Sequence, residues 1–294
     1  MSSNRTNKLF VKRSRGGEVA DLGEFPWMAL LGYKQNNIDI IEFLCGGTII
    51  TETYILTAGH CLEIGENHQI VLARLGEHDL RSTIDCVTFN GEKRCADPHV
   101  DIPVENYVRH SNYDSNKLKN DIALVRIKGP ITFSGECYII HSTNMLTIWK
   151  EFGKQTPSRT KVYYKRLGKR LKQIGLLQKV ISPLYVSGKL GGSPLLQYAS
   201  VRVWEQSSCN KVIPPQVQPI SENQLCANGR KEDACKGDSG GPLSNATLDL
   251  DEELRNFQIG IVSFASTMTC GVEELPPIYT RIDKYLMWIM DNIK

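Results

Sequence analysis

The 294-residue sequence lacks any cysteine or histidine cluster at the spacing of a structural zinc site, although it contains nine cysteines. No CxxC pair occurs, so the cysteines are better interpreted as disulfide partners. Disulfides form and persist in oxidising compartments, which points to a secreted protein. Because nine is odd, one thiol is left over for an intermolecular bond or for no bond at all.

The sequence also lacks long apolar runs. No segment is long enough to span a membrane, and "MSSNRTNKLFV" at the start has no apolar stretch that would serve as a signal peptide. The cysteines indicate a secreted protein, whereas the first residues do not look like a signal peptide. We give the cysteines more weight. We therefore expect that the sequence comes from a truncated gene model and that its first residues are not the native secretory start. Residues 1–15 are polar and basic and predict a propeptide remnant or linker.

Positive charge is scarce outside one segment. The formal net charge is +3, yet ten Lys or Arg and a single Glu lie between His141 and Pro183, so the rest of the chain is net acidic. Residues 138–184 also place Leu167, Leu171 and other apolar residues at helical spacing, although two glycines weaken that helix by about 1 kcal/mol each. One interpretation is a basic surface element for polyanions or anionic lipid. We favour an atypical insertion that is disordered or does not belong to the mature protein.

The remaining pattern is that of an all-β protein. Short apolar runs broken by Gly, Asn or Asp recur, as in "WMALLGY", "LCGGTIIT", "DIALVRI" and "FQIGIVSFA". One convincing helix is expected in "DKYLMWIMDNIK", with an apolar face at Leu286, Ile289 and Met290. No repeat or low-complexity tract stands out.

Three separated residues form a candidate nucleophilic site. "GDSGGPL" holds Ser239, and a serine hydroxyl needs a neighbouring base whose imidazole is oriented by a carboxylate. "LTAGHC" offers His60, and "NDIALVRI" offers Asp121 at the start of an apolar strand. Each residue alone has ordinary structural explanations. The three together, each in a distinctive local sequence, are highly specific for a serine hydrolase.

These three motifs resemble the active-site signatures of the chymotrypsin-like (trypsin-type) serine proteases. The flanking phrases "GGEVADLGEFPWMALLGY", "LGEHDL" and "CADPHVDIPVE" are similar to the catalytic domains of arthropod clip-domain serine proteases (easter-like, prophenoloxidase-activating or venom proteases). The resemblance implies two six-stranded antiparallel β-barrels followed by a C-terminal α-helix. The peptidase domain would cover 16–294, with a first barrel at about 16–136, the insertion at 138–184 and a second barrel at about 185–294.

By this resemblance, Ser239 is the nucleophile, His60 the general acid and base, and Asp121 its orienting carboxylate. The backbone N–H groups of Gly237 and Ser239 would form the oxyanion hole. Asp233 would be the acidic floor of a pocket for an Arg or Lys side chain, and Ser263 would line that pocket. Two wall positions that are usually glycine are Ala265 and Pro277 here, and both should narrow the entry.

The resemblance also implies how the chain matures and which cysteines pair. Cleavage in "KRSRGG" would expose a polar and charged N-terminus, whereas the family inserts an apolar one against the aspartate that corresponds to Asp238. Normal activation, and therefore activity, is in doubt on this ground. Cys137 would remain unpaired, in the place of a tether to a regulatory module. The implied disulfides are Cys45–Cys61, Cys86–Cys95, Cys209–Cys226 and Cys235–Cys270.

Further expectations concern ligands and partners. No cofactor is required, but Glu77, Asp79 and Asp85 are candidates for a structural calcium site through carboxylate oxygens, with solvated acids as the alternative. Asn245 in "NAT" is a candidate glycosylation acceptor on a surface loop. The implied partners are a protein substrate, such as a downstream zymogen or cytokine precursor, and serpin-type inhibitors. We expect a secreted monomer with no nucleic-acid partner.

Two functions therefore remain open. The first is a secreted endopeptidase that cleaves after Arg or Lys in an arthropod cascade for melanisation or Toll-type immunity. The second is a poorly active or inactive homologue that acts as a regulatory binding partner.

Overall fold

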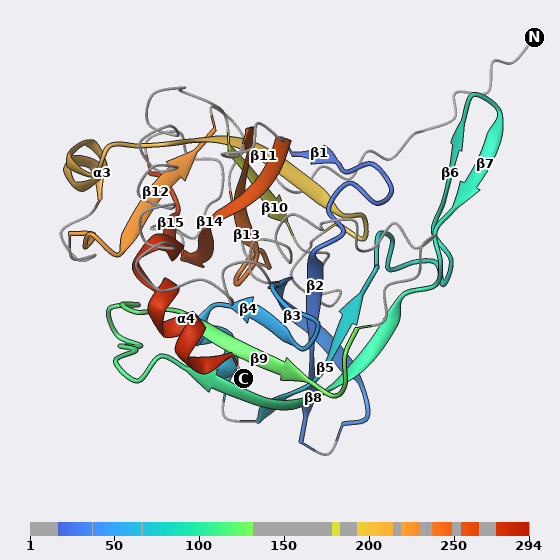
Figure 1. Ribbon diagram of the computed structural model, residues 1–294, viewed down its shortest axis with the longest axis horizontal. Coiled ribbons are helices and arrows are strands. Elements are labelled where there is room, and N and C mark those ends of the chain that lie inside the picture. The colour runs from blue at the N-terminus through green and yellow to red at the C-terminus, as the bar shows by residue number, and fades with distance from the viewer. Residues whose placement is uncertain are drawn as a thin grey trace, which may run out of the picture.

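The computed structural model describes residues 17–36, 38–65, 67–131, 178–182, 193–213, 219–229, 234, 237–248, 254–264 and 275–293. In these residues the regular secondary structure is mainly β-strand and is arranged in two halves (Figure 1). The expected all-β class, built from two antiparallel barrels, is confirmed.

The first half is a closed barrel of six antiparallel strands in the order β2-β3-β4-β9-β8-β5. The apolar runs of the sequence form the strands of this barrel because their side chains fill the interior. In β9, for example, every residue except Arg126 is buried. The strands are β2 (Met28–Gln35), β3 (Ile41–Ile49), β4 (Tyr54–Thr57), β5 (His68–Leu75), β8 (Val100–Arg109) and β9 (Ala123–Ile127).

The second half is a sheet of seven strands in the order β1-β11-β10-β13-β14-β15-β12. An additional pairing of Arg202 and Val203 with Asn228 and Ala227 joins β11 to β12, so that six of the strands form a ring. The strands are β1 (Glu18–Val19), β10 (Gln178–Ser182), β11 (Gln197–Val203), β12 (Gln224–Asn228), β13 (Pro242–Leu248), β14 (Leu254–Phe264) and β15 (Ile278–Arg281).

Strand β10 corrects the expected domain boundary. It lies inside 138–184, which we expected to be an insertion, yet it pairs with β11 on one side and β13 on the other. A strand with two hydrogen-bonded neighbours is an integral part of its sheet, so the second half already includes Gln178. The apolar residues at helical spacing before it lie outside the described residues.

The C-terminal helix forms as expected, although its position could not be read from the sequence. Helix α4 (Leu286–Asn292) follows the 3₁₀ helix η3 (Ile282–Lys284) and buries Leu286 and Ile289. These side chains join the core of the first barrel, so the end of the chain crosses back over β4 and β9 (Figure 1). A second short helix, α3 (Gln206–Val212), was not expected.

One hairpin lies outside both sheets. Strands β6 (Cys86–Phe89) and β7 (Glu92–Cys95) pair only with each other and project from the body of the molecule (Figure 1). Asn90 and Gly91 form its turn with positive φ angles of 52° and 85°, which is the geometry of a tight hairpin. No helix in the described ranges is both long and apolar enough to cross a membrane.

Candidate active site

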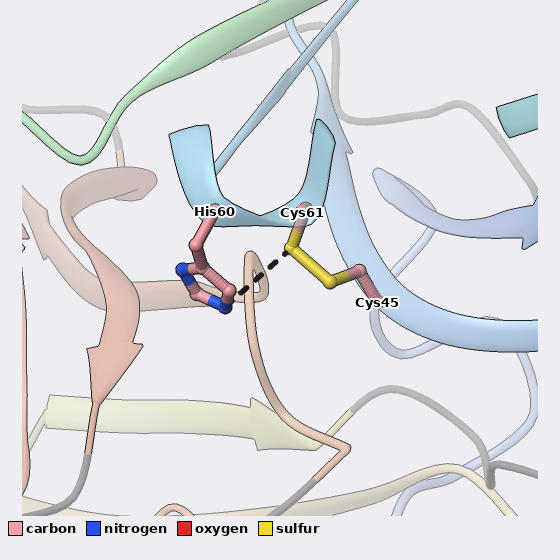
Figure 2. Close-up of side chains that lie close together, drawn as sticks. All are labelled: Cys45, His60 and Cys61. Carbon is pink, nitrogen blue, oxygen red and sulfur yellow. Dashed lines mark hydrogen bonds between the residues drawn. A yellow bond between two sulfur atoms is a disulfide. The ribbon is translucent and has the colours of Figure 1, made fainter. Parts of the chain in front are cut away.

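His60 lies on the 3₁₀ helix η1 (Gly59–Leu62), directly after strand β4. The turn is anchored on the barrel because the disulfide Cys45–Cys61 connects it to β3 (Figure 2). The hydroxyl of Tyr33, a fully buried side chain of β2, donates a 2.8 Å hydrogen bond to the carbonyl of Cys61. The histidine is therefore carried by a rigid turn while its own side chain stays 24% exposed.

Asp121 lies beside His60 although it is 61 residues later in the chain, because it precedes β9, the strand that pairs with β4. Its Oδ2 atom lies 2.8 Å from the ring Nδ1 of His60, and its Oδ1 accepts a 2.8 Å hydrogen bond from the backbone N–H of the same residue. The two contacts fix both the position of the turn and the orientation of the ring. This is the arrangement that a general base requires of its orienting carboxylate.

The buried Asp121 is held in its charged form by several donors. Burial alone would raise the pKa of its carboxyl, but the charge and hydrogen bonds of His60 and the hydroxyl of Ser263 outweigh burial, and the net shift is downward. Ser263 donates to the same Oδ2 that faces the ring. Thr280 donates a 2.7 Å hydrogen bond to the backbone carbonyl of Asp121. Both donors come from the second half, on β14 and β15.

Ser239 is brought to this place by a tight turn between the two halves. Gly237 and Gly240 have φ angles of 98° and 77°, a region that residues with a side chain rarely adopt. The backbone N–H of Gly46 on β3 donates a 2.9 Å hydrogen bond to the carbonyl of Ser239. A Cβ atom on Gly240 would overlap Thr57 and Gly46 and lie 3.1 Å from the Sγ of Cys61. The serine turn is therefore packed against the disulfide that carries His60.

No hydrogen bond connects the hydroxyl of Ser239 to the His60 ring, both of which the structure describes. The ring Nε2 lies 3.8 Å from the Sγ of Cys61 instead (Figure 2). Catalytic hydrogen bonds are often long in unliganded structures and tighten only with substrate. The three predicted residues thus lie in one region, with the histidine–aspartate half already formed.

The same histidine and the two sulfurs nearby form the one cluster in the described residues with the spacing of a metal site. Cys45 and Cys61 are bonded to each other, so they offer no thiolate ligand. The cluster is better explained as the structural support of the histidine turn.

The predicted pocket residues are described only in part. Asp233 and Ala265 lie outside the described residues, as do both cysteines of the expected disulfide Cys235–Cys270. Ala234, the neighbour of Asp233, is buried with Val262 and Tyr279 in the core of the second half. Pro277 is buried directly before β15, and its carbonyl accepts a hydrogen bond from the backbone N–H of Ala227 on β12. Its role as a pocket wall stays a prediction.

Three of the four expected disulfides are present: Cys45–Cys61, Cys86–Cys95 and Cys209–Cys226. Cys137 lies outside the described residues, as do residues 12–16 of the "KRSRGG" segment. Asp238, the expected partner of a new N-terminus, is buried beside the predicted nucleophile Ser239.

The carboxylates of the three expected calcium ligands interact with other groups of the protein. Asp85 accepts the backbone N–H groups of His78 and Asp79 with one oxygen and the hydroxyl of Ser82 with the other. Asp79 forms an ion pair with Arg81. In the described part of the chain these carboxylates do not gather into a group that could share an ion. The arrangement does not fit a calcium site.

The carboxylate of Glu77, the third of these residues, lies beside the guanidinium of Arg74. Its Oε2 lies 3.2 Å from a guanidinium nitrogen of Arg74 and 3.2 Å from Nδ1 of His99. Burial, together with the charge of Asp85, raises the pKa of Glu77 to about 7 despite that guanidinium.

The expected surface position of Asn245 was wrong. It lies within β13 opposite Phe257 and is 2% exposed, and neither atom of its amide has a hydrogen-bond partner. A glycan needs an amide that projects into solvent, which this strand position does not provide in the folded chain. The local motif alone could not reveal that "NAT" lies in a core strand.

Several supporting residues were not recognised from the sequence. Thr280 was not recognised at all, and the contact of Ser263 with Asp121 was not expected. Thr57, whose hydroxyl donates a 2.8 Å hydrogen bond to Gly46, lies inside the quoted motif "LTAGHC", which was a signal that could have been used. Ser263 and Thr280 belong to strands that are far from Asp121 in the sequence, and no local pattern predicts their contacts with it.

Comparison with known proteins identifies the same family. The family model described as Trypsin matches residues 14–147 and 167–289. CLIP domain-containing serine protease B9 of Anopheles gambiae is 33% identical over 287 residues, which are 96% of this chain and 63% of that protein. Phenoloxidase-activating factor 3 of Holotrichia diomphalia is 33% identical over 282 residues, 95% of this chain and 72% of the relative. The chain thus spans about two thirds of the length of such relatives.

Solved structures agree with this result. The crystal structure of the Drosophila Grass clip serine protease of the Toll pathway superposes with a TM-score of 0.72 and 30% identity, over 99% of this chain and 72% of that chain. Mouse neuropsin, at 22% identity and a TM-score of 0.63, shares the fold. With His60 and Asp121 paired beside the serine turn, and with arthropod clip-domain proteases as its relatives, the chain belongs to the trypsin family of serine proteases.

Proposed function

We propose that this chain is a secreted serine endopeptidase that cleaves after Arg or Lys in an arthropod extracellular cascade. The observation that carries the proposal is the His60–Asp121 pair, which is already oriented beside the Ser239 turn. In the proposed reaction, Ser239 attacks the scissile carbonyl while His60 takes its proton, and Asp121 stabilises the resulting imidazolium. The N–H groups of Gly237 and Ser239 would bind the oxyanion.

Substrate choice rests on Asp233 in sequence and on the relatives. A carboxylate at the floor of the pocket would pair with a guanidinium or ammonium group. The names of the relatives refer to phenoloxidase activation and to the Toll pathway, which supports a protein substrate in a cascade of that kind. The disulfides on both halves support an extracellular location.

The test is a hydrolysis assay on matched chromogenic peptides that end in Arg, Lys or Leu, before and after limited trypsin treatment. We expect turnover of the Arg and Lys peptides only, and no turnover by the Ser239→Ala variant. Labelling by an organophosphonate should likewise depend on Ser239. Turnover of the Leu peptide alone would refute the specificity.

A second candidate function is a regulatory homologue that binds a partner without cleaving it. One observation favours it: cleavage within the "KRSRGG" segment would supply a polar N-terminus rather than an apolar one. Absence of both turnover and organophosphonate labelling after trypsin treatment would support this function and exclude the protease.

A further inference from the structure

The last residue of β8, Arg109, lies against the catalytic turn. A Cβ atom placed on Gly59 would lie 3.3 Å from the Cγ of Arg109 and 3.3 Å from the Oδ1 of Asp121. The alkyl stem of the arginine and the aspartate carboxylate therefore border the same small space at the first residue of η1. Glycine leaves that space open, and the stem of Arg109 covers it.

The guanidinium of Arg109 continues past this space to the other end of η1. It forms an ion pair with Glu63, the residue that ends the 3₁₀ helix and whose backbone N–H donates a 3.1 Å hydrogen bond to the carbonyl of His60. It also stacks on Tyr113, with 4.8 Å between its central carbon and the ring centroid. One side chain thus contacts both ends of the four-residue turn that carries His60.

We propose that Arg109 is a positioning residue, which clamps η1 to strand β8 through Glu63 and Tyr113 and so holds His60 against Asp121. The contacts of Arg109 with the turn are a property of the fold. Only their effect on catalysis rests on the proposed function. Arg109 makes no contact with the predicted nucleophile and is not a catalytic residue.

Other charged groups border the same site. Tyr113 is half-buried, and its pKa is raised first by burial and then by the charges of Asp121 and Glu63. Its hydroxyl therefore stays neutral, which leaves the guanidinium as the cation of the clamp. The ion pair is partly exposed, so its loss alone should have a modest effect, and loss of the arginine stem, which packs at Gly59, should add to it.

The first experiment does not need activity. In the Ser239→Ala background, hydrogen exchange of the His60 backbone N–H, which is bonded to Asp121, reports the stability of the turn. We expect Arg109→Met to speed this exchange by up to about fivefold, because the ion pair is lost but the stem remains. Arg109→Ala should speed it further, and Arg109→Lys should stay close to wild type.

Arg126→Met is the matched control. Arg126 on β9 also forms an ion pair, with Glu105 at 2.9 Å, and also lies over an aromatic ring, that of Tyr54. It is not in contact with η1, so its replacement should leave exchange at His60 unchanged. Glu63→Gln removes the ion pair alone, whereas Arg109→Met also removes the stacking on Tyr113, so Glu63→Gln should speed exchange no more than Arg109→Met does. The double variant should match Arg109→Met, because that single variant has already lost the ion pair.

The second experiment measures peptide hydrolysis. If the chain is a protease, Arg109→Met should lower kcat by up to about fivefold and leave KM within about twofold, because the proposed role of the arginine is to position His60 and not to bind substrate. Exchange at His60 that is unaltered in Arg109→Met and Arg109→Ala would overturn the proposal. Absence of hydrolysis by the wild type would refute the proposed function instead, while the exchange experiment would still test the clamp.

Discussion

Asp121 holds His60 twice, through the ring Nδ1 and through the backbone N–H, each at 2.8 Å. The second of these contacts matters as much as the first, because it fixes the turn from which the ring projects. A carboxylate bound in this way cannot follow a movement of the ring without breaking a bond to the main chain. The relative geometry of base and carboxylate is thus set before any substrate arrives.

Replacement of this carboxylate should abolish most activity while the fold is kept. In Asp121→Asn the amide can no longer fix the required ring tautomer. We take the expected loss in kcat, about 10⁴-fold, from the general behaviour of this catalytic triad rather than from the geometry here. Steady-state hydrolysis of an Arg peptide measures it, with circular dichroism as the control for folding. A loss of less than about tenfold would contradict the role of Asp121.

The two donors from the second half should differ in their effects. Ser263→Ala removes a donor to a buried charge, which contributes about 1.5–3 kcal/mol, whereas Thr280→Val removes a neutral bond to a carbonyl, which contributes about 1 kcal/mol. Chemical denaturation at pH 7 measures both changes. Equal losses in the two variants would show that the charge of Asp121 is not supported by Ser263.

The effect of Ser263→Ala should also depend on pH. The folded-state pKa of Asp121 lies below its ordinary value, so its charged form contributes stability above that ordinary value and loses it as the pH falls through the folded pKa. The difference in unfolding free energy between Ser263→Ala and the wild type should therefore be largest at neutral pH and become smaller in strong acid. Denaturation curves between pH 7 and pH 3 would show this.

Gly240→Ala should disrupt the serine turn through a specific overlap. The added Cβ would meet Thr57, the carbonyl of Gly46 and the Sγ of Cys61, at a φ angle of 77°. Gly129→Ala is a matched control, because Gly129 has a φ of 82° and open space around it. Both variants should lose about 1–2 kcal/mol for the backbone conformation, and Gly240→Ala should lose more. Similar unfolding free energies for the two would contradict the close packing of this turn.

Glu77 should make the protein less stable as the pH rises from about 4.5 to 7. Its folded-state pKa is raised to about 7, so the folded state holds a proton that the unfolded state releases above 4.5. Ionisation of this buried carboxyl lowers the free energy of unfolding. This loss is absent below about pH 4.5 and complete above about pH 7. Glu77→Gln should flatten that part of the profile of Tm against pH, whereas Glu92→Gln, on the exposed hairpin, should not. Parallel profiles for wild type and Glu77→Gln would refute the assignment.

Calcium should leave the thermal stability unchanged. The carboxylates of Asp79 and Asp85 are bound by protein donors, and Arg74 already neutralises Glu77. Because a ligand that binds only the folded state raises Tm as its concentration rises, calorimetry with calcium or with a chelator is a direct test. A saturable rise of Tm with calcium would show that a site forms in spite of these contacts.

The sequence predicted the parts of this protein that depend on local chemistry. The motifs around His60, Asp121 and Ser239 identified the site, and the apolar runs predicted the strands. Three cysteine pairings followed from the family resemblance and are confirmed. The predictions failed where a residue's environment comes from distant strands. Asn245 looked like a loop residue and is buried in β13, and Gln178–Ser182 looked like part of an insertion and is a strand with two neighbours.

The sequence by itself thus determined the candidate catalytic residues, the β-sheet class and the family, because short contiguous stretches carry these signals. Only the tertiary structure decided which groups support those residues: Ser263 and Thr280 beneath Asp121, Gly46 behind Ser239, and Arg109 across η1. The physical reason is that a buried charge and a rigid turn are stabilised by donors that chain folding brings from far away. Side-chain periodicity records which residues are buried, but not which distant partner each one meets.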